Sequence, residues 1–130
     1  MEVNLQLCNL MKFTTLVLGA SANPDRYSYL AIHSLVSRNH QVIAVGNSEG
    51  EVKGVQIKRA IPHIEDLDTL TLFINPSNQK SYYDRIIQQK PKRIIFNPGA
   101  ENEELEILAM ENGIEFINAC TILMLTTGNY

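Results

Sequence analysis

A ten-residue segment that begins at Gly19 has the residue types that bind phosphate groups in proteins. Gly19 allows the chain to turn tightly, and the small side chains after it would let a phosphate approach the backbone closely. Ser28 can cap a helix, whose first amide groups would face the same point, and Arg26 adds a positive charge there. A purely structural tight turn is the alternative interpretation. The candidate phosphate-binding residues are Gly19, Ala20, Ser21, Pro24, Arg26 and Ser28.

The dinucleotide fingerprint G-x-G-x-x-G is only partly present, because its three glycine positions hold Gly19, Ser21 and Pro24. The second predicted strand is followed by Asn47 and Ser48, where an acidic side chain would hold the ribose hydroxyls of NAD. The first carboxylate comes only at Glu49, which argues against NAD and leaves room for a nucleotide with a phosphate on this ribose, which a carboxylate would repel.

Lys53, a few residues further on, could contact such a ribose phosphate as a point charge. Taken alone, it is better interpreted as an ordinary solvated lysine. We therefore group Lys53 with Asn47 and Ser48 as candidates for one end of a nucleotide.

Two further strand ends carry similar polar residues. Asn75, Pro76 and Ser77 follow one predicted strand, where they could contact a ligand while Ser77 or Asn78 caps the next helix. Asn97 and Gly99 follow the next strand, but three glutamates come soon after them. The second of these loops is therefore a poor phosphate site, and we expect it to line the far side of a pocket.

The elements that position these loops alternate along the chain. Short apolar, β-branched runs predict buried strands, and apolar residues at helical spacing predict the intervening helices. This alternation predicts an α/β fold with a doubly wound, mostly parallel sheet of five or six strands and helices on both faces. Ligands of such folds bind beyond the carboxyl ends of the strands. The predicted strands are 14–18, 41–45, 55–57, 70–74, 93–96 and 115–117, and the predicted helices are 28–39, 77–90, 102–112 and a last turn at 121–125.

Length and composition limit what else the protein can be. The 130 residues carry a net charge of −3 and suit one domain, which we place at 11–130 after an N-terminal appendage, 1–10, with Met11 as an alternative start. The mild acidity argues against a nucleic-acid partner, and no apolar run is long enough to span a membrane. Two widely separated cysteines, Cys8 and Cys120, favour a reduced, cytoplasmic protein, and the histidine spacing predicts no metal site.

No catalytic constellation is evident. Ser21 lacks the G-x-S-x-G context of a nucleophile elbow, and His33 falls inside the first predicted helix. Cys120, just after the last strand, is the one side chain near the predicted pocket with nucleophilic potential, although an inert thiol is the simpler interpretation.

The first loop, with Gly19, Ser21, Pro24, Arg26 and Ser28-Tyr29 in register, resembles that of the coenzyme A-binding domain family. These are small stand-alone Rossmann-like proteins, similar to the CoA-binding domain of succinyl-CoA synthetase α subunits, and the resemblance covers about residues 13–125. It implies that the first loop cradles the phosphates of CoA. It also implies that Asn47, Ser48 and Lys53 lie near the adenosine, with Asn75, Pro76 and Ser77 near the pantetheine path. The rim departs from the family pattern, since Gly46-Asn47-Ser48 replaces a Pro-Val-Asn-Pro stretch.

We therefore expect a protein that binds a small nucleotide ligand, coenzyme A or an acyl-CoA, without metal and without catalysis of its own. The alternatives are an NAD(P)-linked or acyl-transfer enzyme completed by a partner or by Cys120, and an interaction module that has lost its ligand. A homodimer is the assembly expected by default.

Overall fold

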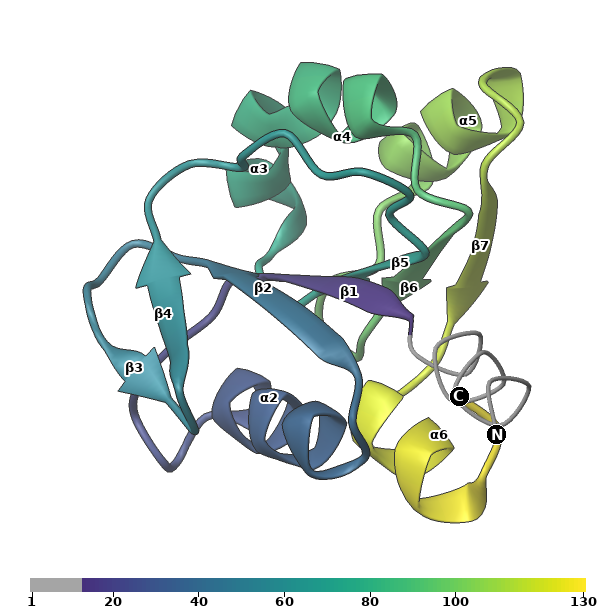
Figure 1. The fold of residues 1–130 in the computed structure, drawn as a ribbon. Coiled ribbons are helices and arrows are strands. Elements are labelled where there is room, and N and C mark those ends of the chain that lie inside the picture. Colours follow the sequence, from purple (N-terminus) through teal and green to yellow (C-terminus); the bar gives the residue numbers. More distant parts are fainter. Residues whose placement is uncertain (1–12) are drawn as a thin grey trace.

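One seven-stranded sheet forms the centre of the molecule, with strand order β3-β4-β2-β1-β5-β6-β7 (Figure 1). The computed structural model describes residues 13–130, so the predicted appendage, Met11 and Cys8 lie outside the described residues. All neighbouring strands are parallel except β3, which pairs antiparallel with β4. The strands are β1 (Thr14–Leu18), β2 (Gln41–Val45), β3 (Glu51–Val52), β4 (Val55–Lys58), β5 (Thr69–Leu72), β6 (Arg93–Phe96) and β7 (Glu115–Asn118).

The predicted fold class is confirmed, and the strand count differs by one. The six parallel strands correspond to the six predicted ones, whereas β3 adds a seventh. It was missed because its two residues lie in a stretch dominated by Gly, Asn, Ser and Glu, which indicates a turn.

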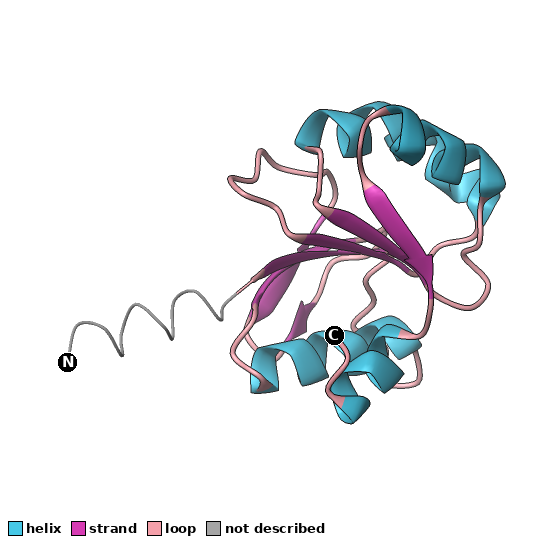
Figure 2. Ribbon diagram, turned by 90° about the vertical axis from the view of Figure 1, so that its right-hand side faces the viewer, coloured by secondary structure: helices cyan, strands magenta, loops and turns pink. Residues whose placement is uncertain are grey.

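Helices cover both faces of the sheet (Figure 2). One face carries α2 (Tyr27–Ser37) and α6 (Thr121–Thr127), and the other carries α3 (Pro76–Gln79), α4 (Tyr83–Gln89) and α5 (Glu103–Glu111). Successive β1 side chains divide between the two layers: Leu16 and Leu18 pack with the α4 and α5 side, and Val17 packs with Ile32 of α2. Since neither face is left open, the central strands β1, β5 and β6 are buried on both sides.

Three local predictions are wrong. β5 ends at Leu72, two residues before the predicted end, so Phe73 and Ile74 belong to the following loop. Ser28 does not cap α2, because the N-cap position is Arg26, without a side-chain cap bond, and Ser28 lies buried in the first turn. Neither Ser77 nor Asn78 caps α3: the Asn75 side chain does so, accepting a hydrogen bond from the Asn78 amide over 3.0 Å.

The sheet contains one point where the chain changes direction. From β1 the chain passes through α2 to β2 on one side, and from β5 it passes to β6 on the other. The loops after β1 and β5 therefore diverge to opposite faces while their strands stay neighbours, which is the arrangement that opens a crevice. None of the helices in the described part, 13–130, is long and apolar enough to cross a membrane.

Candidate functional site

A cleft of about 590 Å³ lies at the carboxyl ends of the strands, at the point where strand order reverses. Half of the residues that line it come from the loop after β1 and the start of α2, and the others follow β2, β5 and β6. The predicted candidates that line it are Gly19, Ala20, Ser21, Arg26, Ser28, Asn47, Ser48 and Asn75. Asp25, Tyr27, Phe73, Ile74, Asn78 and Pro98 complete the lining.

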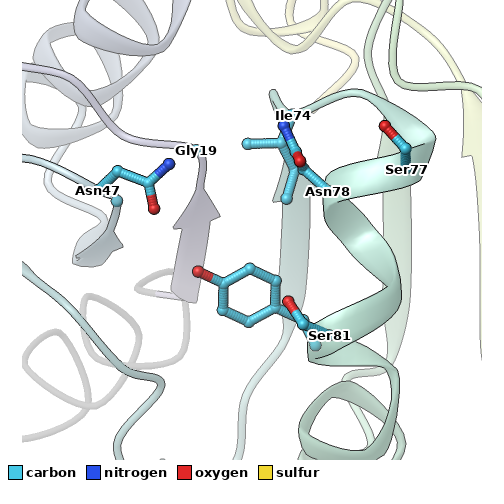
Figure 3. A pocket seen from close by; sticks show the side chains of 8 residues that line it. Gly19, Asn47, Ile74, Ser77, Asn78 and Ser81 are labelled. Carbon is cyan, nitrogen blue, oxygen red and sulfur yellow. The ribbon is translucent and has the colours of Figure 1, made fainter.

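A smaller cavity of about 190 Å³ adjoins the cleft and shares four of its residues, Gly19, Asn47, Ile74 and Asn78. Its remaining lining residues are Gly46, Ser77, Ser81 and Tyr82. Figure 3 shows Asn47 on one side of this cavity and Ile74 and Asn78 on the other. The two spaces together suit an elongated ligand with a charged end and a smaller, less charged end.

The floor of the cleft is a close backbone contact between loops. The amides of Gly19 and Ala20 both donate to the carbonyl oxygen of Val45, each over 2.9 Å. A Cβ at Gly19, where φ is +96°, would lie 2.5 Å from Ile74 Cγ2, and a Cβ at Gly46 would lie 2.2 Å from the Ala20 oxygen. Only glycine fits at either position, because any side chain would separate the loops that form the floor.

The start of α2 leaves hydrogen-bond donors unused. Within 13–130, no residue accepts a hydrogen bond from the amides of Tyr27 or Ser28, and α2 has no acidic residue in its first turn. The preceding loop is held by local bonds, from the Asn23 amide to Ser21 Oγ (3.1 Å) and from the Asp25 amide to Asn23 Oδ1 (3.0 Å). A rigid loop with free N–H groups at a positive dipole end is suited to bind an anionic group such as a phosphate.

Two opposite charges lie at this helix start. Arg26 and Asp25 both line the cleft and both are exposed. Arg26 adds to the field of the helix N-terminus, and Asp25 opposes it. Arg26 would therefore strengthen the binding of a phosphate, and Asp25 would cancel part of that effect.

A comparison with known families matches this chain to the CoA binding domain over residues 14–126. The chain belongs to the CoA binding domain family. Its fold resembles a crystal structure titled only as an uncharacterized protein, at 51% identity and a TM-score of 0.88, covering 92% of this chain and 98% of that one. No curated protein sequence matches it.

More distant structures share the fold. A hypothetical protein from Pyrococcus horikoshii OT3 is 20% identical, with a TM-score of 0.81 over 98% of this chain and 91% of that one. A dinucleotide-forming acetyl-coenzyme A synthetase 1 from Ca. Korarchaeum cryptofilum is 18% identical, with a TM-score of 0.68. The match covers 87% of this chain and 27% of the synthetase chain. At these identities the likeness shows the fold alone.

Several predicted site residues of this CoA binding domain lie outside the cleft. Ser77 lines only the smaller cavity, and Pro24, Lys53, Pro76, Asn97 and Gly99 line neither. The Asn97 side chain is buried, donating to Thr71 Oγ1 (2.7 Å) and the Leu72 carbonyl (2.8 Å) and accepting from the Thr121 amide (2.8 Å). Asn97 thus joins β5, β6 and α6, while its neighbour Pro98 reaches the cleft.

The apolar wall of the CoA binding domain cleft was missed by sequence reasoning. Phe73 and Ile74 were assigned to a strand, although the sheet register aligns Leu18, Leu72 and Phe96 as the last strand residues. A signal did exist, because parallel neighbours of similar length end together. Aligning the first residues after the three strands, Gly19, Phe73 and Asn97, would have placed Phe73 and Ile74 in the loop that lines the cleft.

The potential nucleophile of this CoA binding domain lies apart from the cavities. Cys120 is a free, partly exposed thiol at the N-cap of α6, and it lines neither space. Within the described part of the chain, no group of three or more His, Cys, Asp or Glu residues could hold a metal ion.

Proposed function

We propose that this protein binds coenzyme A or an acyl-CoA non-covalently in the cleft, without catalysing a reaction itself. The observation that carries the proposal is the pair of amides at Tyr27 and Ser28, which find no acceptor among residues 13–130 and lie beside Arg26 in a cleft at the reversal of strand order. CoA carries a diphosphate and a ribose phosphate, so its charge suits such a site. Membership of the CoA binding domain family supports the same ligand class.

The ribose end of the ligand is assigned to the loop after β2. Asn47 and Ser48 line the cleft there and carry no charge, and Glu49, the carboxylate of this loop, lines neither cavity. Lys53 lies in the turn between β3 and β4 and is kept as a candidate for the same phosphate. Asn75, Ser77 and Pro98 are assigned to the remainder of the ligand, along the β5 and β6 side.

A binding role without catalysis is supported by the position of Cys120. A thiol that takes part in acyl transfer must reach the thioester, and Cys120 lines neither cavity.

We also propose a cytoplasmic location, on the cysteine usage, and a homodimer, which sedimentation would test.

Isothermal titration with CoA, acetyl-CoA, NAD and NADP tests the proposal. We expect saturable heat with CoA or acetyl-CoA and much weaker heat with NAD. No heat with either CoA species, at concentrations well above micromolar, would overturn it. Binding of NADP alone would point to a dinucleotide enzyme. The melting temperature is measured with the same nucleotides, and if none of them raises it, the result would point to an interaction module.

The reactivity of Cys120 separates binding from covalent catalysis. An inert thiol should react slowly with a thiol reagent at neutral pH, whereas a thiolate activated for acyl transfer would react rapidly. Because Cys8 is also present, the Cys8→Ser variant is used, so that the measured rate belongs to Cys120.

A further inference from the structure

A fully buried glutamine lies behind the wall of the cleft. Gln79, the last residue of α3, is 0% exposed, and its amide nitrogen donates to the carbonyl oxygens of Ile74 (2.9 Å) and Ala100 (2.8 Å). These carbonyls belong to the loops after β5 and β6. Among the residues described, Gln79 is the only donor to either oxygen. A single side chain therefore joins the two loops.

A second buried amide extends this connection to α5. Asn102 Nδ2 donates to Gln79 Oε1 (2.8 Å) and to the Tyr83 hydroxyl (2.7 Å), while its own oxygen caps α5 by accepting from the Glu104 amide (3.1 Å). The Tyr83 hydroxyl is protonated at neutral pH, and burial raises its pKa further above the ordinary value. Every polar group of the Gln79 amide is paired, so the network holds a single geometry.

The two joined loops form one side of the proposed ligand site. Ile74 lines both cavities and lies against Gly19 of the loop after β1, and Pro98, two residues before Ala100, lines the larger cleft. We propose that Gln79 is a positioning residue that holds the Ile74 wall against the Pro98 wall and thereby sets ligand affinity. This inference rests on the proposed function, since it concerns the same cleft.

The test compares ligand affinity and stability in matched variants. Gln79→Met keeps the length and apolar volume but removes both donors, and we expect CoA binding to weaken about tenfold at a temperature where the variant is folded. The control is Thr121→Val, which removes a buried hydrogen bond to Thr71 Oγ1 (2.7 Å) on the opposite face, away from both cavities. It should lose stability and keep wild-type affinity. Equal affinity in Gln79→Met and Thr121→Val would overturn the proposal.

Gln79→Glu adds a readout that a merely structural role would not move. Its carboxylate would face two carbonyl oxygens, whereas the protonated form regains one donor. Relative to wild type at each pH, the affinity of Gln79→Glu should recover as the pH falls from 8 to 5.5. A constant ratio would contradict the role of the donors.

Amide hydrogen exchange without ligand keeps this inference distinct from the proposed function. In Gln79→Met, exchange should become faster in residues 73–78 and 97–101, and Thr121→Val should leave residues 73–78 unchanged. Unaltered exchange in Gln79→Met would overturn the positioning role. If the wild-type protein fails to bind CoA, the proposed function fails, and the exchange result alone decides whether Gln79 joins the two loops.

Discussion

The loops after β1 and β6 perform the same structural task. Each carries the chain from a buried strand to the N-terminus of a helix, and each contains a glycine with positive φ, +96° at Gly19 and +93° at Gly99. The two helix starts nevertheless differ in what occupies their amide groups. That difference explains why a phosphate is assigned to one junction and not to the other.

At the β6–α5 junction the protein supplies its own acceptors. The Gly99 amide donates to Glu101 Oε1 (2.8 Å), and Asn102 Oδ1 accepts from the Glu104 and Leu105 amides. Acidic residues also fill the first turn of α5. At the β1–α2 junction, no residue within 13–130 accepts from the amides of Tyr27 or Ser28, and the N-cap residue is Arg26. Free donors at the start of α2 favour an anion there, whereas the carboxylates around the start of α5 would repel one.

Replacing each glycine by alanine should give the largest contrast. Both substitutions place a side chain in a left-handed conformation, but only the Cβ at Gly19 would also press on Ile74 and the Phe73 backbone, while the Cβ at Gly99 would meet nothing within 4 Å. We expect Gly19→Ala to cost about 2–5 kcal/mol of unfolding free energy and Gly99→Ala about 1–2 kcal/mol. Urea denaturation measures both. Equal losses would mean that the close packing at Gly19 contributes nothing.

Removing a positively charged side chain should weaken CoA binding at the β1–α2 junction but not at the β6–α5 junction. Arg26→Ala should reduce affinity by about 1–3 kcal/mol, the range of a charge-assisted hydrogen bond, or about five- to 150-fold. Lys80 serves as the matched control, because it lies near the second junction, 3.9 Å from Glu104 Oε1, with both side chains mainly exposed. Lys80→Ala should bind CoA as wild type does. Titration calorimetry decides, and an unchanged affinity in Arg26→Ala would remove Arg26 from the site.

Removing a helix cap should affect stability at the other junction. Asn102→Ala deletes the cap of α5 together with the bond to Gln79, and should cost about 1–3 kcal/mol. Arg26 occupies the same N-cap position on α2 but makes no side-chain cap bond, so Arg26→Ala should change stability by less than about 0.5 kcal/mol. Similar melting temperatures for the two variants would contradict the division between a binding junction and a structural one.

The sequence predicted the sheet and the loops that line the cleft better than the ends of the individual elements. The periodicity of buried strands and the small residues after Gly19 are local signals, and both led to the correct sheet and to the residues that line the cleft. Whether a polar residue faces a ligand or the interior depends on partners distant in sequence. Asn97 illustrates this, because its bonds to Thr71 and Thr121 bury its side chain. The role of Gln79 could not be predicted for the same reason, because only the folded chain brings the carbonyl groups of Ile74 and Ala100 to its side chain.

The smallest effect should come from the acidic residue beside Arg26. Asp25 lines the cleft, is exposed and opposes a bound phosphate, so Asp25→Asn should strengthen CoA binding about two- to fivefold at low salt. The side-chain amide keeps the size of the residue, and the backbone bond from the Asp25 amide to Asn23 is untouched. Added salt should reduce the gain, because exposed charges are screened within about 8 Å at physiological ionic strength.

Glu101→Gln is the partner experiment at the second junction. Glu101 holds the Gly99 amide but lines neither cavity, so its neutralisation should leave CoA affinity unchanged. If Glu101→Gln strengthened binding as much as Asp25→Asn, the gain would reflect the overall charge of −3 rather than the local field at α2. A gain confined to Asp25→Asn would place the bound phosphate near the start of α2.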